Sequence, residues 1–160
     1  MKRYPLQTLL QLRAHRTAAA RQVVLERQRG VQQCREACSR IEGEISTLGN
    51  ERAAQRTRLL DPPPPGVAWP AAMAQREAHI DLLGERIAAA RQRLSKAEDA
   101  LRQAEAALDE ARVAFFRAKA REDALEKRRD VWRDDQRGLQ ARQEEALTED
   151  LLQARHMARH

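Results

Sequence analysis

Two cysteines and two histidines are the residues whose types and spacing could support chemistry in this chain. Cys34 and Cys38 are four residues apart, as are His156 and His160, so each pair would share one side of a helix. The cysteines could act as a redox switch or as half of a metal site, but no nearby histidine or further cysteine completes a ligand set. We therefore interpret them as small apolar side chains of a helix interface. The histidine pair could bind a metal only weakly, and we predict no metal site there.

The charged side chains do not form a catalytic pattern either. Carboxylates alternate with arginines, as in Glu122-Asp123 ahead of Lys127-Arg128-Arg129, and this alternation is typical of solvated helix faces. The sequence contains no glycine-rich phosphate loop and no nucleophile elbow. We expect no catalytic residues, no cofactor and no enzyme activity, and instead a protein that acts by binding.

The composition predicts long helices in place of a compact core. Of 160 residues, 42% are hydrophobic but only 3% are aromatic, while 34% are charged. A globular core of this length would use more large side chains, whereas a mixture of Ala, Glu, Arg, Leu and Gln is typical of coiled coils. We predict an all-α fold, in which residues 1–160 form a single domain built as a long antiparallel two-helix coiled-coil hairpin.

The stretch 61–70 divides the two predicted helices. Pro62 to Pro65 cannot continue a helix, because each proline lacks a backbone donor and clashes with the preceding turn. Gly66 allows a reversal of direction, and Pro70 suits the first turn of the next helix. We therefore expect a proline-rich bend at residues 61–70.

A heptad pattern runs through residues 5–60, the first predicted helix. Its positions alternate by three and four residues, which implies a left-handed supercoil with a partner helix. The seam consists of Leu6, Leu10, Arg13, Thr17, Ala20, Val24, Arg27, Val31, Cys34, Cys38, Ile41, Ile45, Leu48, Arg52, Gln55 and Leu59.

Residues 70–155, the second predicted helix, carry two apolar columns. Large residues form the first column, namely Met73, Ile80, Ile87, Leu94, Leu101, Leu108 and Phe115. Mainly alanines form the second, namely Leu83, Ala90, Ala97, Ala104, Ala111, Ala118, Leu125, Trp132 and Leu139. The first column turns polar at Glu122, and folding the chain about Pro65 places Leu6 near Leu125. We therefore expect the second helix to overhang alone at residues 126–155, followed by a tail at 156–160.

The expected overhang could be a probe that docks into another protein or a frayed tail. Trp132, Leu139 and Ala146 keep a thin apolar stripe on one of its sides. Tryptophan is costly to expose and is enriched at binding hot spots. We therefore favour docking.

The net charge of +6 and pI near 10.1 permit acidic partners of several kinds. No long block of like charge occurs, so we favour solvated faces over a nucleic-acid stripe. No secretory signal and no apolar run of membrane-spanning length is present. We expect a cytoplasmic protein without direct membrane insertion.

The opening Tyr4-Pro5-Leu6-Gln7-Thr8-Leu9-Leu10-Gln11-Leu12-Arg13 resembles the start of the YscO/FliJ family, the central-stalk proteins of type III secretion and flagellar export ATPases. The region from Ala124 to Glu145 is similar to the C-terminal part of that family. The resemblance implies a non-enzymatic stalk at the cytoplasmic face of the inner-membrane secretion apparatus, with a role in virulence. Its partners would be the hexameric secretion ATPase, an export gate protein and export chaperones, and it would be a monomer or a weak homo-oligomer.

By this resemblance, the paired termini would enter the pore of the ATPase ring, where basic side chains could meet acidic pore loops. The partner-binding residues would be Leu6, Leu9, Leu10, Arg13, Arg16, Lys127, Arg128, Arg129, Trp132, Arg133, Arg137 and Leu139. Two alternatives stay open. One is a generic structural or chaperone-binding coiled coil, and the other is a basic nucleic-acid-binding coiled coil, against which the few aromatic residues argue.

Overall fold

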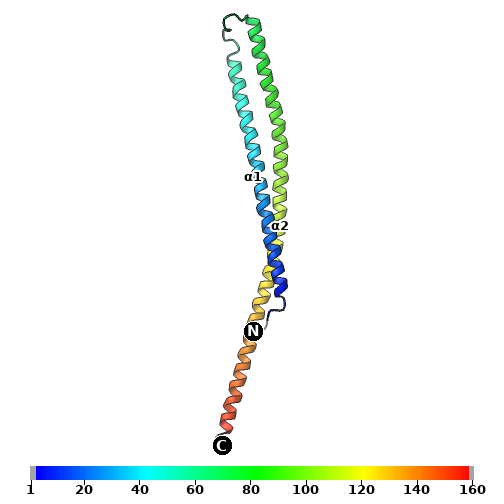
Figure 1. Ribbon diagram of the computed structural model, residues 1–160, viewed down its shortest axis with the longest axis vertical. Coiled ribbons are helices and arrows are strands. Elements are labelled where there is room, and N and C mark those ends of the chain that lie inside the picture. The colour runs from blue at the N-terminus through cyan, green and yellow to red at the C-terminus, as the bar shows by residue number, and fades with distance from the viewer. Residues whose placement is uncertain (1–2, 159–160) are drawn as a thin grey trace. The chain divides into compact units, whose positions relative to one another are not determined.

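The computed structural model describes residues 3–158 (Figure 1). Of the histidine pair considered above, His160 lies outside the described residues. Over residues 3–158 the secondary structure consists of two α-helices without strands: α1, Gln7–Thr57, and α2, Trp69–Met157. They lie within or close to the expected ranges 5–60 and 70–155. The predicted all-α antiparallel hairpin is confirmed.

The bend between the helices is fixed by backbone geometry and by one arginine. Gly66 has a φ of 85°, a left-handed conformation that glycine adopts without a steric penalty. Arg76 Nη1 of α2 donates hydrogen bonds to three carbonyl oxygens of the turn that follows α1, those of Arg58 (3.3 Å), Leu59 (3.0 Å) and Asp61 (2.7 Å). Turn carbonyls need a donor from outside a helix ladder, so Arg76 ties the start of the bend to α2.

The described chain divides into two compact units. The bend unit consists of residues 24–110, and the terminal unit consists of residues 3–23 together with 111–158. In each unit a stretch of α1 packs against an antiparallel stretch of α2.

The bend unit has a continuous apolar interface. Its most buried side chain is Leu83, which has 0% exposure and lies in the alanine column with the equally inaccessible Ala90. Val31 and Cys38 of α1 are also buried, as are Ile80, Ile87 and Leu108 of α2. Each fully buried large side chain contributes roughly 1.5–3 kcal/mol of transfer free energy.

The terminal unit has a thinner interface. Leu10 and Thr17 of α1 are buried together with Ala111 and Leu125 of α2, while Phe115 is half-buried. The buried Thr17 hydroxyl donates a 3.1 Å hydrogen bond to the Arg13 carbonyl, one turn earlier in α1. The predicted α1 seam holds across both units except at Leu6 and Arg27, which are exposed.

Burial of α2 side chains in the terminal unit extends beyond residue 126, where the overhang was expected to begin. Leu125 is buried, and Trp132 and Gln136 are still half-buried. From Arg137 onward, every described side chain is exposed. The unpaired part of α2 therefore comprises residues 137–157, which correspond to about 30 Å of helix at 1.5 Å per residue.

Candidate partner-binding surface

All the residues predicted to bind a partner lie in the terminal unit. On the N-terminal side, Leu6 and Leu9 are exposed, Arg16 is exposed and Arg13 is half-buried. Leu10 has only 5% exposure, because it is part of the helix interface. Leu10 therefore supports this surface from beneath and is not available for direct contact.

Arg13 and Arg16 form part of a groove that sequence reasoning did not assign in full. Arg117 and Arg121 of α2 line it together with them, and Ala114 and Ala118 are its other lining residues. The groove has a volume of about 290 Å³ and is named the terminal groove below. Arg117 and Arg121 are one helical turn apart and flank Ala118 of the alanine column, which is the sequence signal that could have revealed them.

A second basic stretch follows on α2. Lys127, Arg128 and Arg133 are exposed, and none of the three has an ion-pair partner within the described part of the chain. Arg129 differs, because its side chain is mostly buried and its Nε lies 3.6 Å from the Asp130 carboxylate. Lys127, Arg128 and Arg133 are therefore the free charges that an acidic partner could contact.

The other arginine predicted on this stretch is already paired. Arg137 pairs with Asp134 one turn earlier on α2. Lys119, nearer the start of the unit, lies 3.0 Å from Asp123. The hydrogen bond from this ammonium to Asp123 raises the pKa of Lys119 above its ordinary value, so Lys119 stays charged.

Trp132 does not project freely as predicted, because Tyr4 packs against it. The two ring centroids are 5.4 Å apart with an interplanar angle of 57°, and Tyr4 retains 9% exposure. The Tyr4 carbonyl also accepts a hydrogen bond from the Gln7 amide, which begins α1. Tilted aromatic pairs contribute about 0.5–1.5 kcal/mol beyond their area burial. The pair therefore fixes the segment before α1 onto α2 and covers α2 beyond the start of α1.

The unpaired residues 137–157 carry more apolar surface than the sequence analysis recognised. Leu139 is exposed as predicted, and further along the helix Leu147, Leu151, Leu152 and Met157 are between 62% and 81% exposed. Leu147 and Leu151 are four residues apart and so lie on one side of α2. Such spacing is typical of a helix that places its apolar face in a groove of a partner.

The cysteines lie in the bend unit, away from this surface. Both are free thiols; Cys38 is buried and Cys34 is half-buried in the helix interface. Burial, with the carboxylates of Glu98 and Glu42 nearby, raises the pKa of the Cys38 thiol. A raised thiol pKa disfavours the reactive thiolate, in keeping with a packing role.

Neither a metal cluster nor a membrane span is found in the part of the chain that the structure describes. No three His, Cys, Asp or Glu side chains among residues 3–158 are grouped so as to hold a metal ion. None of the helical segments in that range has an apolar stretch long enough to cross a bilayer.

A helical hairpin with an arginine-lined groove and an unpaired helical end defines a coiled-coil protein. Comparison with known sequences gives the family: the YscO-like protein model matches residues 1–160, and the chain belongs to the YscO-like family. The protein is thus a coiled-coil protein related to type III secretion, from a family of structural, non-enzymatic type. No curated protein matches the sequence significantly.

A solved structure is also similar to this chain. It is that of CT670, a proposed YscO homolog from Chlamydia trachomatis, with a TM-score of 0.74 and 22% sequence identity. The match covers 98% of this chain and 96% of the other. At this identity the likeness shows the shared fold alone.

Proposed function

We propose that this protein is the coupling stalk of a type III secretion system. In this role it binds the hexameric export ATPase through the terminal unit and links the ATPase to the export gate. It acts at the cytoplasmic face of the inner membrane as part of a virulence apparatus, and export chaperones bind along its exposed faces.

The observation that carries this proposal is that the terminal unit combines a groove lined by arginines with an unpaired helical end whose leucines are exposed. Four arginines line the terminal groove, and Lys127, Arg128 and Arg133 have no ion-pair partner among the described residues. The same unit contains the exposed leucines of residues 137–157. A basic surface next to an apolar helix face suits an acidic protein surface that also offers an apolar groove.

The test is stimulation of ATP hydrolysis by the candidate ATPase. The variant combines Lys127→Glu, Arg128→Glu and Arg133→Glu, which are exposed and leave the helix interface intact. We expect this charge reversal to abolish stimulation with no change in helicity, because like charges then face the acidic partner.

The matched control makes the same change of charge in the bend unit. It combines Arg29→Glu, Arg40→Glu and Arg86→Glu, three exposed arginines. The control is expected to stimulate hydrolysis as the unaltered protein does. Equal stimulation by both triple variants would reject the assignment of the terminal unit to the ATPase.

A further inference from the structure

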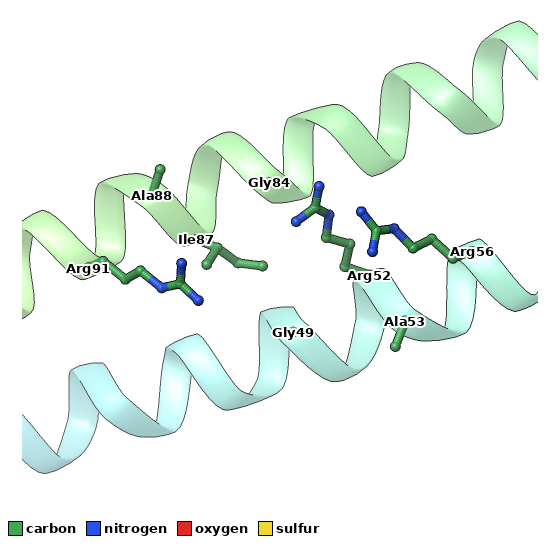
Figure 2. A pocket seen from close by; sticks show the side chains of 8 residues that line it. All are labelled: Gly49, Arg52, Ala53, Arg56, Gly84, Ile87, Ala88 and Arg91. Carbon is green, nitrogen blue, oxygen red and sulfur yellow. The ribbon is translucent and has the colours of Figure 1, made fainter.

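A second arginine-lined groove lies in the bend unit. The groove, named the bend groove below, has a volume of about 410 Å³ (Figure 2). It is lined from α1 by Gly49, Arg52, Ala53 and Arg56, and from α2 by Gly84, Ile87, Ala88 and Arg91. Figure 2 shows the side chains of Arg52, Arg56 and Arg91 reaching into the space between the two helices.

Gly84 leaves room for the Arg52 guanidinium. A Cβ atom placed on Gly84 would be 3.1 Å from Nη2 of Arg52 and 3.2 Å from its Cζ. Real Cβ contacts are rarely so short, so a side chain at position 84 would require the guanidinium to shift by a few tenths of an ångström. Gly84 thus permits a cation from α1 to lie against the backbone of α2.

The cations of the bend groove are not neutralised within the described chain. Nε of Arg52 is inaccessible to solvent and has no hydrogen-bond acceptor. No ion pair joins Arg52, Arg56 or Arg91 to a carboxylate among residues 3–158. A buried donor without an acceptor is unfavourable, and three nearby cations repel one another.

The two carboxylates of α1 that contact α2 in this region have partners outside the groove. Glu44 accepts a 2.7 Å hydrogen bond from Arg93, and Glu51 lies 3.6 Å from His79. The positive charge of the bend groove therefore remains available to a ligand.

We propose that the bend groove binds a phosphate-bearing anion. Guanidinium groups match phosphate oxygens with paired, charge-assisted hydrogen bonds. The three arginines approach from two helices, so a tetrahedral group with oxygens in several directions satisfies more of them than a planar carboxylate does. A phosphate also carries up to two charges against the uncompensated positive charge of the groove.

The experiment measures binding of inorganic pyrophosphate to the full-length protein by calorimetry, at fixed ionic strength. Arg52→Gln combined with Arg91→Gln should weaken binding at least about tenfold, because charge-assisted hydrogen bonds are lost. Arg29→Gln combined with Arg40→Gln removes the same charge from exposed positions of the bend unit that line neither groove, and should change the affinity less than about twofold. Equal losses in the two double variants would mean only general attraction to a basic protein and would overturn the proposal.

A second pair of variants tests the geometry without changing the charge. Gly84→Ala places a methyl group against the Arg52 guanidinium, whereas Gly43→Ala adds one where no atom lies within 4 Å. Both replacements favour the helix, so neither should unfold it. Gly84→Ala should weaken pyrophosphate binding several-fold and Gly43→Ala should leave it unchanged. Unchanged binding in Gly84→Ala would contradict the assigned site.

Vesicles identify the source of the phosphate group. Binding to vesicles that contain phosphatidic acid, with loss in the Arg52 and Arg91 variant, would assign a lipid headgroup; binding of free pyrophosphate alone would assign a soluble anion. The proposal would be overturned if the protein bound neither the vesicles nor pyrophosphate. It would also be overturned if a glutamate-rich peptide bound more tightly than pyrophosphate. The ATPase assay reports on the terminal unit, so its outcome does not depend on whether the bend groove binds pyrophosphate.

Discussion

The bend unit and the terminal unit use the same two helices differently. In the bend unit, two ion pairs join the helices: Arg35 lies 3.3 Å from Glu105, and Arg93 lies 2.7 Å from Glu44. A third pair, Arg102 with Asp99, lies within α2. In the terminal unit, Lys119 pairs with Asp123 and Arg137 with Asp134, so these ion pairs lie within α2. The comparison indicates that ion pairs connect the two helices in the bend unit, whereas the terminal unit combines unpaired cations with exposed leucines at the end of α2.

The largest expected effect is the loss of the most buried side chain of the bend unit. Leu83→Ala should lower the free energy of unfolding by about 2–5 kcal/mol, because it removes buried methyl groups and leaves a cavity. The same substitution at Leu147, which is 62% exposed, should change it by less than about 0.5 kcal/mol. Urea denaturation followed by circular dichroism measures both, and similar losses would contradict the contrast between the units.

The next effect concerns the aromatic pair that ends the pairing in the terminal unit. Tyr4→Ala should destabilise the first turns of α1 by about 1 kcal/mol or more, because it removes both ring contact and burial. Tyr4→Phe keeps the ring and should behave as the unaltered protein. Hydrogen exchange at the start of α1 reports the difference, and identical exchange in the alanine variant would show that the pair does not hold this segment.

A smaller effect is expected at the bend. Arg76→Ala leaves the carbonyls of Arg58, Leu59 and Asp61 without their shared donor, and should cost about 1 kcal/mol. Arg58→Ala removes an exposed side chain and keeps its backbone carbonyl, so it serves as the control. The midpoint of thermal unfolding should be lower for Arg76→Ala than for Arg58→Ala. Equal midpoints would show that the hydrogen bonds of Arg76 do not stabilise the bend.

The smallest expected effect is the pH dependence of the stability contributed by the surface ion pair of Glu44 and Arg93. The hydrogen bond from Arg93 lowers the pKa of Glu44 below its ordinary value. A lowered carboxyl pKa contributes stability that is present above the unfolded-state pKa and is lost as the pH falls through the folded-state pKa. Glu44→Gln should therefore be slightly less stable than the unaltered protein at neutral pH, and the difference should vanish in strong acid. A stability difference that grows as the pH falls would contradict a lowered pKa of Glu44.

The sequence predicted the elements well, because its signals are local. Four consecutive prolines set the bend, and the heptad seam correctly identified Val31 and Cys38 as interface residues. The fully exposed part of α2 begins later than the predicted overhang, because Tyr4 precedes the seam and its contact with Trp132 joins distant parts of the sequence. The two grooves were missed for a related reason. A heptad count gives the face of each helix, but the register between helices decides which arginines meet across it.

Hydrogen–deuterium exchange of the full-length protein, with and without the secretion ATPase hexamer, shows which unit the ATPase contacts. Binding should protect the terminal unit, most strongly at residues 137–157 where the described side chains are all exposed, and leave the bend unit unchanged. Protection confined to residues 24–110 would instead assign the ATPase contact to the bend unit and rule out the proposed role of the terminal unit.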